Sequence, residues 1–458
     1  MTAPAVASEL PLDATASWPE LRRRTWSLAW PVIFSFSIEA LVGLFDILMV
    51  GRLGATAVAG VGVGIQVMGA VDATLFAVGT GALAIVARHI GAGDRRAADE
   101  TLRQSIVAAA ALSILAAVPV FLAAPAIIRA FHVDEAVVAA GTPFLRTVML
   151  GVPAAAVLFV VVATLRGAGD TRTPLAVGAV VGTANVGLAY VLIFGRLGLP
   201  ALGVAGAATA TVLAFTIGAT LGVTLLLRGG LVLRLRLRPL RLRPDVIRRV
   251  LDIGVPAALE HLLMQVGFFI YIVFAAHHGT APVAAYFIGA RILSLSFLPG
   301  FGFGAAAATM VGQSLGAGRP DDAERSGGAA VRLALGLMTA AGAVVFVAAR
   351  PIARLFVDDD AVVENAFGFI RVLATVQPLM AIDFSLGGAL RGAGDTRYPL
   401  LTVILGFYVC RLGFAYLVTF TLGLGVLWLW LAVLGDYAAR ATLKARRFRS
   451  GAWKLVRV

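Results

Sequence analysis

A stretch of sequence occurs twice in this chain, almost letter for letter, and this repeat limits the possible folds more than any other feature. Leu165–Pro174 reads LRGAGDTRTP and Leu390–Pro399 reads LRGAGDTRYP, which is a shift of 225 along the chain. The same shift carries Pro31 onto Pro256. A constant register over such a distance indicates that the chain contains two copies of one structural unit.

The composition indicates that the two copies lie in a lipid bilayer. The chain has 458 residues, of which 60% are hydrophobic and 14% charged, and its mean hydropathy is +0.92. About 20 apolar residues in a helix cross a bilayer core about 30 Å thick. The apolar runs are long and lack the alternation of a β-barrel, so we predict helices. The expected spans are residues 27–50, 57–87, 103–128, 136–164, 174–195, 203–227, 248–276, 282–312, 327–349, 361–389, 399–421 and 424–443.

The fold class expected from these runs is an all-α integral membrane protein with twelve transmembrane helices in two six-helix repeats. The expected organisation is a tail at residues 1–24, an N-lobe at 25–227, a basic linker at 228–249, a C-lobe at 250–443 and a basic tail at 444–458. The single cysteine, Cys410, excludes a disulfide within the chain. Residues 1–20 lack the pattern of a signal peptide, so the first span is expected to stay in the protein.

The net charge of +13 is a signal of topology rather than of nucleic-acid binding. Most Lys and Arg residues fall in the two tails and in alternate loops, so the positive-inside rule places both termini in the cytoplasm. Anionic lipid headgroups are the expected partners of this basic side. The linker at 228–249 alternates Arg with Leu and contains no nucleic-acid-binding module, so no nucleic-acid partner is expected.

Ionisable residues at membrane depth are costly, so each is a functional candidate, although burial between helices can also serve packing. Glu39 and Asp46 lie seven positions apart in the first span, which places both on one face of a helix. Oxygen-bearing side chains in the other spans of this half complete the candidate cluster. These are Gln66, Asp72, Asn185, Tyr190 and Thr209. The cluster could exchange a proton or hold Na⁺, which prefers oxygen ligands.

The second half differs at the matching positions. The shift of 225 places Met264 at Glu39, Tyr271 at Asp46, Phe297 at Asp72 and Cys410 at Asn185. This asymmetry favours coupling chemistry in one lobe, because acids required by the fold would be expected in both copies. The second half instead contributes the candidates Glu260, Gln265 and Asp383 to a substrate cavity, with Arg291 as an intramembrane base. Its histidines fit no metal spacing, so no metal site is expected.

Several of these segments together resemble the multidrug and toxic compound extrusion (MATE) family. They are Leu41–Gly54, the two LRGAGDTR turns, and the Gly-Ala-Gly loops at 91–93 and 316–318. The amino-acid sequence of the first span is most similar to the DinF-like branch of this family. The resemblance implies two six-helix lobes around a central cavity and antiport of organic cations or other drugs against protons or sodium.

The resemblance also implies roles for single residues. Asp46 matches the family's first-helix carboxylate, Pro31 a proline at which that helix bends, and Asn185 an asparagine of the fifth helix. The chain departs from the family at Ala189, where some members carry an acid. It also departs at the seventh-helix and tenth-helix acids of another branch, which fall at Met264 and Met380.

We therefore expect a bacterial inner-membrane antiporter that exports drug-like compounds in exchange for protons, without a cofactor and as a monomer. The alternatives are sodium coupling and a lipid-linked precursor flippase, which would be expected to have more cationic residues in its cavity. A channel is a further alternative. An enzyme is disfavoured because the sequence has no HExxH or Ser-His constellation at one depth, and a P-loop is absent.

Overall fold

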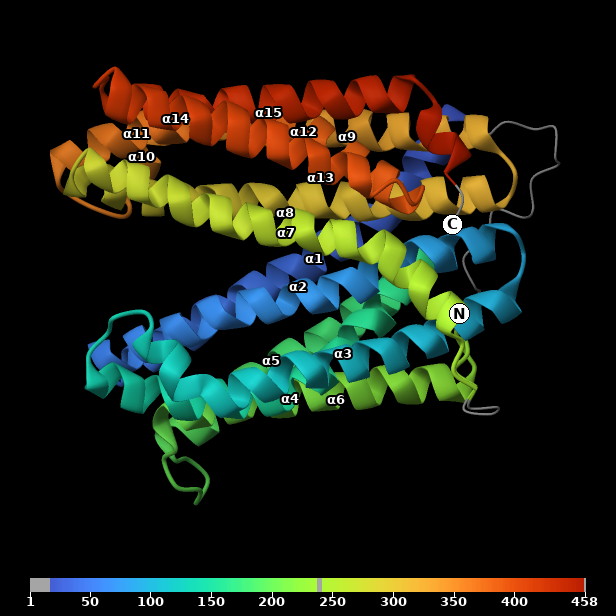
Figure 1. Ribbon diagram of the computed structural model, residues 1–458, viewed down its shortest axis with the longest axis horizontal. Helices are drawn as coiled ribbons and strands as arrows, with labels where there is room; N and C mark the ends of the chain where they lie inside the picture. The colour runs from blue at the N-terminus through green and yellow to red at the C-terminus, as the bar shows by residue number, and fades with distance from the viewer. Residues whose placement is uncertain (1–16, 237–240, 457–458) are drawn as a thin grey trace. The chain divides into compact units, whose positions relative to one another are not determined.

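In the computed structural model, which describes residues 17–236 and 241–456, every regular element is a helix (Figure 1). The amino-terminal half contains α1 (Trp18–Gly51), α2 (Ala55–Gly91), α3 (Arg95–Arg129), α4 (Glu135–Gly167), α5 (Arg172–Phe194) and α6 (Gly203–Arg228). The carboxyl-terminal half contains α7 (Pro244–His277), α8 (Thr280–Gly316), α9 (Pro320–Val347), α10 (Ala349–Arg354), α11 (Asp360–Thr375), α12 (Gln377–Gly392), α13 (Arg397–Val403), η2 (Ile404–Gly413), α14 (Phe414–Tyr416), η3 (Leu417–Thr421), α15 (Val426–Arg449) and η4 (Ala452–Leu455).

The predicted spans are confirmed as helices. Eleven helices of the described residues are long and apolar enough to cross a membrane, and the count is twelve if the bent pair α11 and α12 forms one span. That pair bends by 49°. The span predicted at 399–421 is also irregular, since η2 and η3 are π-helical. Parts of the predicted amino-terminal tail and linker, residues 1–16 and 237–240, lie outside the described residues.

The chain divides into two compact units, and the boundaries between them lie inside the first helix of each repeat. Unit 1 contains Phe34–Ala258, and unit 2 contains the part of α1 up to Ile33 together with Leu259–Val458. The repeat shift carries Ile33 onto Ala258. The first helix of each repeat therefore begins in the unit formed by the other repeat. The N-lobe and C-lobe boundaries that we expected from the sequence separate the two repeats. These boundaries stay a prediction.

Small residues allow these first helix segments to pack closely. In unit 1, a Cβ at Gly254 of α7 would lie 1.8 Å from the Ala77 carbonyl oxygen of α2. In unit 2, a Cβ at Gly302 of α8 would lie 3.0 Å from the Ala29 carbonyl oxygen of α1. The repeat shift relates Ala77 to Gly302 and Ala29 to Gly254, so the same crossing is built twice with the glycine on opposite partners.

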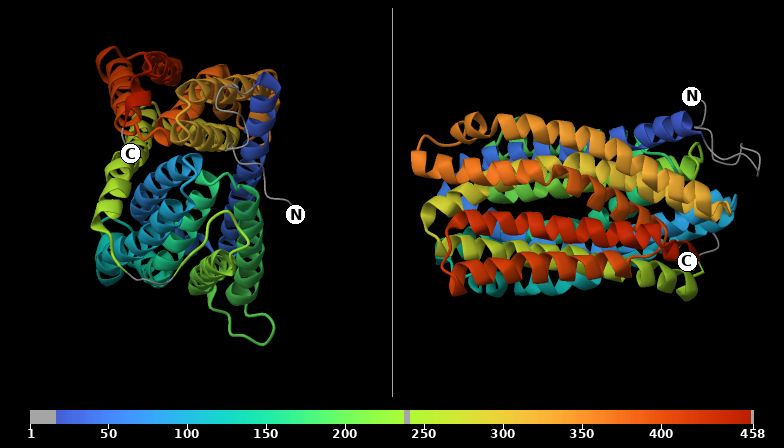
Figure 2. Two further views of the ribbon diagram at one scale, coloured as in Figure 1. Left: turned by 90° about the vertical axis from the view of Figure 1, so that its right-hand side faces the viewer. Right: turned by 90° about the horizontal axis from the view of Figure 1, so that it is seen from above.

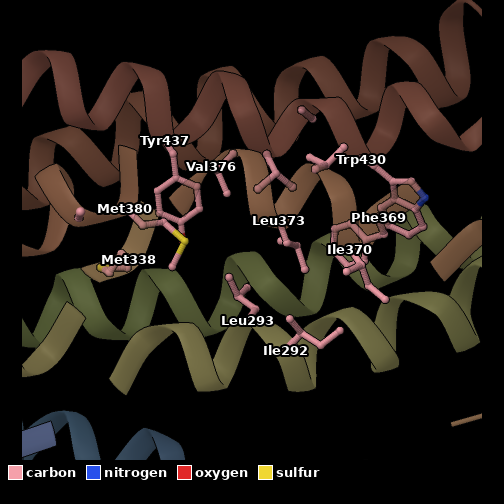
Figure 3. Close-up of a cluster of buried hydrophobic side chains, with 14 of the residues drawn as sticks. Ile292, Leu293, Met338, Phe369, Ile370, Leu373, Val376, Met380, Trp430 and Tyr437 are labelled. Carbon is pink, nitrogen blue, oxygen red and sulfur yellow. The ribbon is translucent and has the colours of Figure 1, made fainter. Parts of the chain in front are cut away.

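Aromatic and branched side chains form the core of unit 2 (Figure 3). The Phe369 ring of α11 stacks on Trp430 of α15 with centroids 4.2 Å apart, and Tyr437 is buried further along α15. Ile292 and Leu293 of α8 face this layer. The close packing fixes α15 against α11, which matters because α15 also carries several buried charges.

Candidate functional site

Asp46 and Asn185 form a direct pair in unit 1. The Asn185 amide nitrogen donates to both carboxylate oxygens of Asp46, at 3.0 Å each. The pairing follows from local packing, because Gly182 of α5 lies directly against Ile38 and Val42 of α1 and leaves no room for a Cβ. Asn185 lies about one helical turn after this contact, opposite Asp46, so the two residues that the sequence places on different spans meet in the structure.

The Asn185 side chain has one unused hydrogen-bonding atom. Asn185 is only 4% exposed, and within the described residues its Oδ1 has no hydrogen-bond partner. A buried acceptor without a partner is rare and requires an explanation. The pair therefore offers three oxygens close together, two of them on a half-buried carboxylate, which suits a proton or a small cation.

A second acidic cluster in unit 1 includes an arginine of the repeated turn. The Glu39 carboxylate interacts electrostatically with the guanidinium of Arg166, and Asp72 interacts with Glu39. The Arg166 guanidinium lies 5.2 Å from the centroid of the Phe36 ring, about one turn before Glu39 on α1. Glu39 and Asp72 are both exposed on unit 1. Glu39 thus has a guanidinium and a second carboxylate as neighbours, and two carboxylates with one guanidinium suit a cation.

The remaining candidates of the first half make other contacts. Gln66 is exposed, and Tyr190 is 48% exposed with its ring edge-on to Phe194. The Thr209 hydroxyl donates to the Ala205 carbonyl of its own helix at 2.8 Å. Within the described residues, no hydrogen bond joins any of these three side chains to the acids of α1 and α2, and their role in a substrate cavity stays a prediction.

The two acidic candidates of unit 2 accept hydrogen bonds from basic side chains. Arg391 donates to both Glu260 oxygens at 3.1 and 3.2 Å. Asp383 accepts from Arg440 at 2.5 Å and from Lys444 at 2.6 Å, and it is 1% exposed. A buried carboxylate with two cationic donors is well satisfied and is held ionised. The third candidate, Gln265, is exposed on α7.

Sequence reasoning missed the bases that surround these acids. The buried network contains Glu260, Asp383 and Asp436 among Arg391, Arg411, Arg440 and Lys444. A signal was present, because Asp436, Arg440 and Lys444 recur at every fourth position and therefore share one face of α15. Arg411 of η2 lies 3.7 Å from Asp436 and 4.1 Å from the Tyr271 ring centroid.

The repeated turn has the same structural role in both halves. Gly167 lies so close to α2, and Gly392 so close to α8, that a Cβ would meet the carbonyl oxygens of Leu83 and Ala308 at 2.6 and 2.1 Å. Leu83 and Ala308 are themselves related by the repeat. The arginine before each glycine reaches an acid on the first helix of its own repeat, Glu39 for Arg166 and Glu260 for Arg391.

The aspartates of the two turns act differently from each other. The Asp170 carboxylate accepts from the backbone amides of Arg172 and Thr173, at 3.1 and 2.9 Å. Asp395 pairs at 2.8 Å with Arg447 of α15. Among the described residues, no group of three or more His, Cys, Asp or Glu side chains could hold a metal ion.

Comparison with known proteins gives consistent family matches. The MatE family model matches residues 31–191 and again residues 256–417. The two matches begin at Pro31 and Pro256, which the repeat shift relates, and this agreement confirms the internal duplication.

The curated relatives span nearly the whole chain. A protein named "Probable multidrug resistance protein NorM" from Thermotoga maritima is 30% identical over 440 residues, which is 95% of this chain and 94% of that protein. "Multidrug resistance protein MdtK" from Edwardsiella ictaluri is 26% identical over 443 residues, 94% of this chain and 96% of that protein.

Solved structures show the same fold. A MOP superfamily transporter from Pyrococcus furiosus superposes with a TM-score of 0.88 at 23% identity and covers 97% of this chain and 100% of its own. A MATE structure in complex with MaD3S gives a TM-score of 0.87 at 23% identity, covering 96% of this chain and 99% of that one.

Proposed function

Because the chain belongs to the MatE family, we propose that it is a secondary active antiporter that exports organic, often cationic, compounds in exchange for protons by alternating access. The names of the relatives support export of drug-like compounds. They do not distinguish a branch of the family, and the DinF-like assignment stays a prediction from the first span. We also propose an inner-membrane location with both termini in the cytoplasm, and a monomer as the transporting unit.

The observation that carries the proton proposal is the different state of the acids in the two units. Glu260 and Asp383 of unit 2 accept hydrogen bonds from arginine and lysine side chains. Asp46 of unit 1 accepts instead from the neutral amide of Asn185. A carboxylate with a neutral partner can gain a proton at lower cost than one that must first break an ion pair. Asp46 is therefore the proposed coupling residue, assisted by Asn185.

Glu39 and Asp72 are proposed as the second part of the coupling site. Glu39 interacts with the Arg166 guanidinium, whereas the charged neighbour of Asp72 is Glu39 itself, so this cluster attracts a proton or the cationic substrate. Pro31 precedes both Glu39 and Asp46 on α1 and lies shortly before the boundary between the units at Ile33. A proline removes one backbone hydrogen bond of the helix, so we propose that α1 bends there during transport.

The test uses purified protein in liposomes with an imposed proton gradient and a fluorescent lipophilic cation. Wild type is expected to move the cation in response to the gradient, and Asp46→Asn is expected to lose roughly 10-fold or more of this rate, since loss of a required proton carrier abolishes the coupled step. Asp252→Asn on the exposed start of α7 is the matched control and is expected to transport as wild type does. Full gradient-driven transport by Asp46→Asn would refute the assignment of the coupling residue.

The same liposomes separate the alternatives. Transport driven by a sodium gradient but not by a proton gradient would favour sodium coupling. Failure with both gradients, together with movement of a fluorescent lipid-linked precursor, would favour the flippase. Arg291 of α8, which is exposed, is the base that the flippase would use. Arg291→Ala would then reduce movement of the lipid-linked precursor.

A further inference from the structure

A hollow lies in unit 2 beside the start of α1. It has a volume of about 540 Å³ and is lined by Pro19, Arg22, Arg23 and Trp26 of α1 and by Leu333 of α9. Figure 2 shows the start of α1, in blue, alongside the yellow-orange helices α8 and α9. The Trp26 ring centroid lies 6.2 Å from that of Phe303 on α8, and the residues that line the hollow come from α1 and α9 of one unit.

Among the described residues, the two arginines of the hollow have no counter-charge. Arg22 and Arg23 are exposed, and within residues 17–236 and 241–456 neither guanidinium has a hydrogen-bond or ion-pair partner. Arg24, the next residue, is used differently, because it donates to Gln313 of α8 at 2.6 Å. The acid of this turn, Glu20, accepts from the amide and hydroxyl of Ser17 at 2.8 Å each.

The surroundings of these arginines are both basic and apolar. The Arg332 guanidinium of α9 lies 4.9 Å from the centroid of the Trp18 ring, at the same end of α1. Trp26 is 47% exposed and Leu333 lies next to Arg332, so the hollow has an apolar side beneath a basic rim. The positive-inside rule places this end of α1 at the cytoplasmic surface of the bilayer, where tryptophan side chains are enriched.

We propose that this hollow binds an anionic phospholipid, with the headgroup phosphate held by Arg22 and Arg23 and an acyl chain lying on Trp26 and Leu333. Guanidinium groups bind phosphate oxygens in a bidentate manner. Basic pockets between transmembrane helices on the cytoplasmic side suit anionic headgroups. The sign of the charge excludes the cationic compounds of the proposed transport cycle from this hollow, so it is a site for lipid rather than for cargo.

The repeat supplies an internal comparison. The shift of 225 places Arg248 and Arg249 of α7 at the positions of Arg23 and Arg24, with the same expected depth in the membrane. The counterparts of Trp26 and Leu333 in the other repeat are a leucine and an alanine, Leu251 and Ala108. Arg248 also has a carboxylate partner, Asp252, at 3.9 Å. The start of α7 therefore also carries two neighbouring arginines, but it lacks the tryptophan and the leucine of the proposed site, and one of its arginines is paired.

The consequence of lipid binding follows from where the hollow lies. The segment of α1 that lines it belongs to unit 2, and the same helix continues into unit 1 after Ile33. A lipid bound by both α1 and α9 would hold this first segment against unit 2. The lipid content of the membrane would thereby affect the stability of α1 before Pro31.

The first test measures lipid retention by native mass spectrometry of the full-length protein in detergent, with dioleoyl phosphatidylglycerol or dioleoyl phosphatidylcholine added. Wild type is expected to retain phosphatidylglycerol in preference to phosphatidylcholine. Arg22→Ala/Arg23→Ala is expected to bind it on the order of 30-fold more weakly, since each basic residue near the surface contributes about a fivefold effect. Arg248→Ala/Arg249→Ala is the matched control and is expected to keep most of the binding.

The second test locates the lipid. Phosphatidylglycerol with brominated acyl chains is expected to quench tryptophan fluorescence in wild type, and Trp26→Phe is expected to lose a component of that quenching. Equal loss of binding in the two arginine double variants would overturn the proposal, because the effect would then be general surface attraction. Binding of inorganic phosphate that depends on Arg22 and Arg23, with unchanged quenching in Trp26→Phe, would also overturn it in favour of a free-phosphate site.

Discussion

At the scale of single residues, the acidic side chains of the two units have different kinds of partner. Unit 2 surrounds its acids with bases, and the pair of Arg411 and Asp436 is completely buried, with side chains 1% and 0% exposed. Unit 1 leaves Asp46 with an amide partner and Glu39 with a guanidinium that also lies near Phe36. Buried pairs hold structure, whereas incompletely neutralised acids can change charge during a cycle. The difference supports placing the coupling step in unit 1.

We predict that Asp436→Leu strongly destabilises the protein, by about 3–5 kcal/mol, because Arg411 would remain buried without its carboxylate. The measurement is the thermal unfolding of the purified protein in detergent. The double variant Asp436→Leu/Arg411→Met is expected to recover much of the loss, since it buries no unpaired charge. A single variant as stable as wild type would show that the Arg411 charge is balanced elsewhere.

At the scale of helices, the first helix of each repeat is shared between the two units, and glycine makes this possible. α7 passes so close to α2 that the Ala77 carbonyl oxygen lies where a Cβ at position 254 would have to be. The span at 397–421 departs from the α-helix beside a similar close contact. Gly406 of η2 lies against Arg440 and Asp436 of α15, where a Cβ would lie 2.5 Å from Arg440 Cγ. π-Helical turns are common at functional sites, where they change which side chains face a neighbouring helix.

We predict that Gly254→Val separates the start of α7 from α2 and lowers stability by about 1–3 kcal/mol, the usual cost of forcing extra volume into a packed contact. Thermal unfolding in detergent is again the measurement. Gly435→Ala on α15 is the matched control, because a Cβ there has no atom within 4 Å, and it is expected to be neutral or slightly stabilising. Equal effects of the two substitutions would argue against the close approach of α7 and α2.

At the scale of the whole chain, the segment that follows the sixth helix of each repeat forms a hydrogen bond with an acidic side chain, and the two acids occupy equivalent positions in the repeats. The Arg234 amide donates to Asp99 at 2.8 Å, and Lys454 donates to Glu324 at 2.6 Å. Asp99 and Glu324 are related by the shift of 225. At the carboxyl end, Trp453 is buried and stacks on Phe448 with centroids 4.8 Å apart. The carboxyl-terminal segment is thus a folded part of unit 2.

We predict that Trp453→Ala releases this segment and costs about 3–5 kcal/mol, as expected for removal of a buried tryptophan. Proteolysis of the carboxyl end and thermal unfolding in detergent measure the effect. Trp428→Ala is the control, because that tryptophan is 46% exposed and is expected to cost much less. A carboxyl end that resists proteolysis equally in wild type and Trp453→Ala would contradict the prediction.

We predict a much smaller effect for Lys454→Met, at most about 1 kcal/mol, because the carboxylate partners of Lys454 are exposed. The hydrogen bond to Glu324 raises the pKa of Lys454 above its ordinary value. A raised pKa in the folded state means that the contribution is fully present at neutral pH and is lost only as the pH rises through that raised pKa. Thermal unfolding at neutral and strongly alkaline pH checks this, and a difference between wild type and variant that grows with pH would contradict it.

Much of the architecture could be predicted from the chain alone. The repeat, the membrane-crossing helices and the meeting of Asp46 with Asn185 required only the register of the LRGAGDTR turns, the length of the apolar runs and the family resemblance of the first and fifth spans. These features depend on local composition and on a duplication that leaves visible copies. The roles of Gln66, Tyr190, Thr209 and Gln265 in a cavity stay predictions.

The sequence by itself determined that the chain is a duplicated bundle of helices in lipid, because long apolar runs have few other ways to satisfy their backbone in a membrane. Only the tertiary structure decided which charges neutralise one another. Asp383 and Arg440 lie 57 residues apart in the chain, and Glu260 and Arg391 lie 131 apart. It also decided that the first helix of each repeat begins in the other unit. Such pairings depend on the packing of distant helices, which no local pattern of residues encodes.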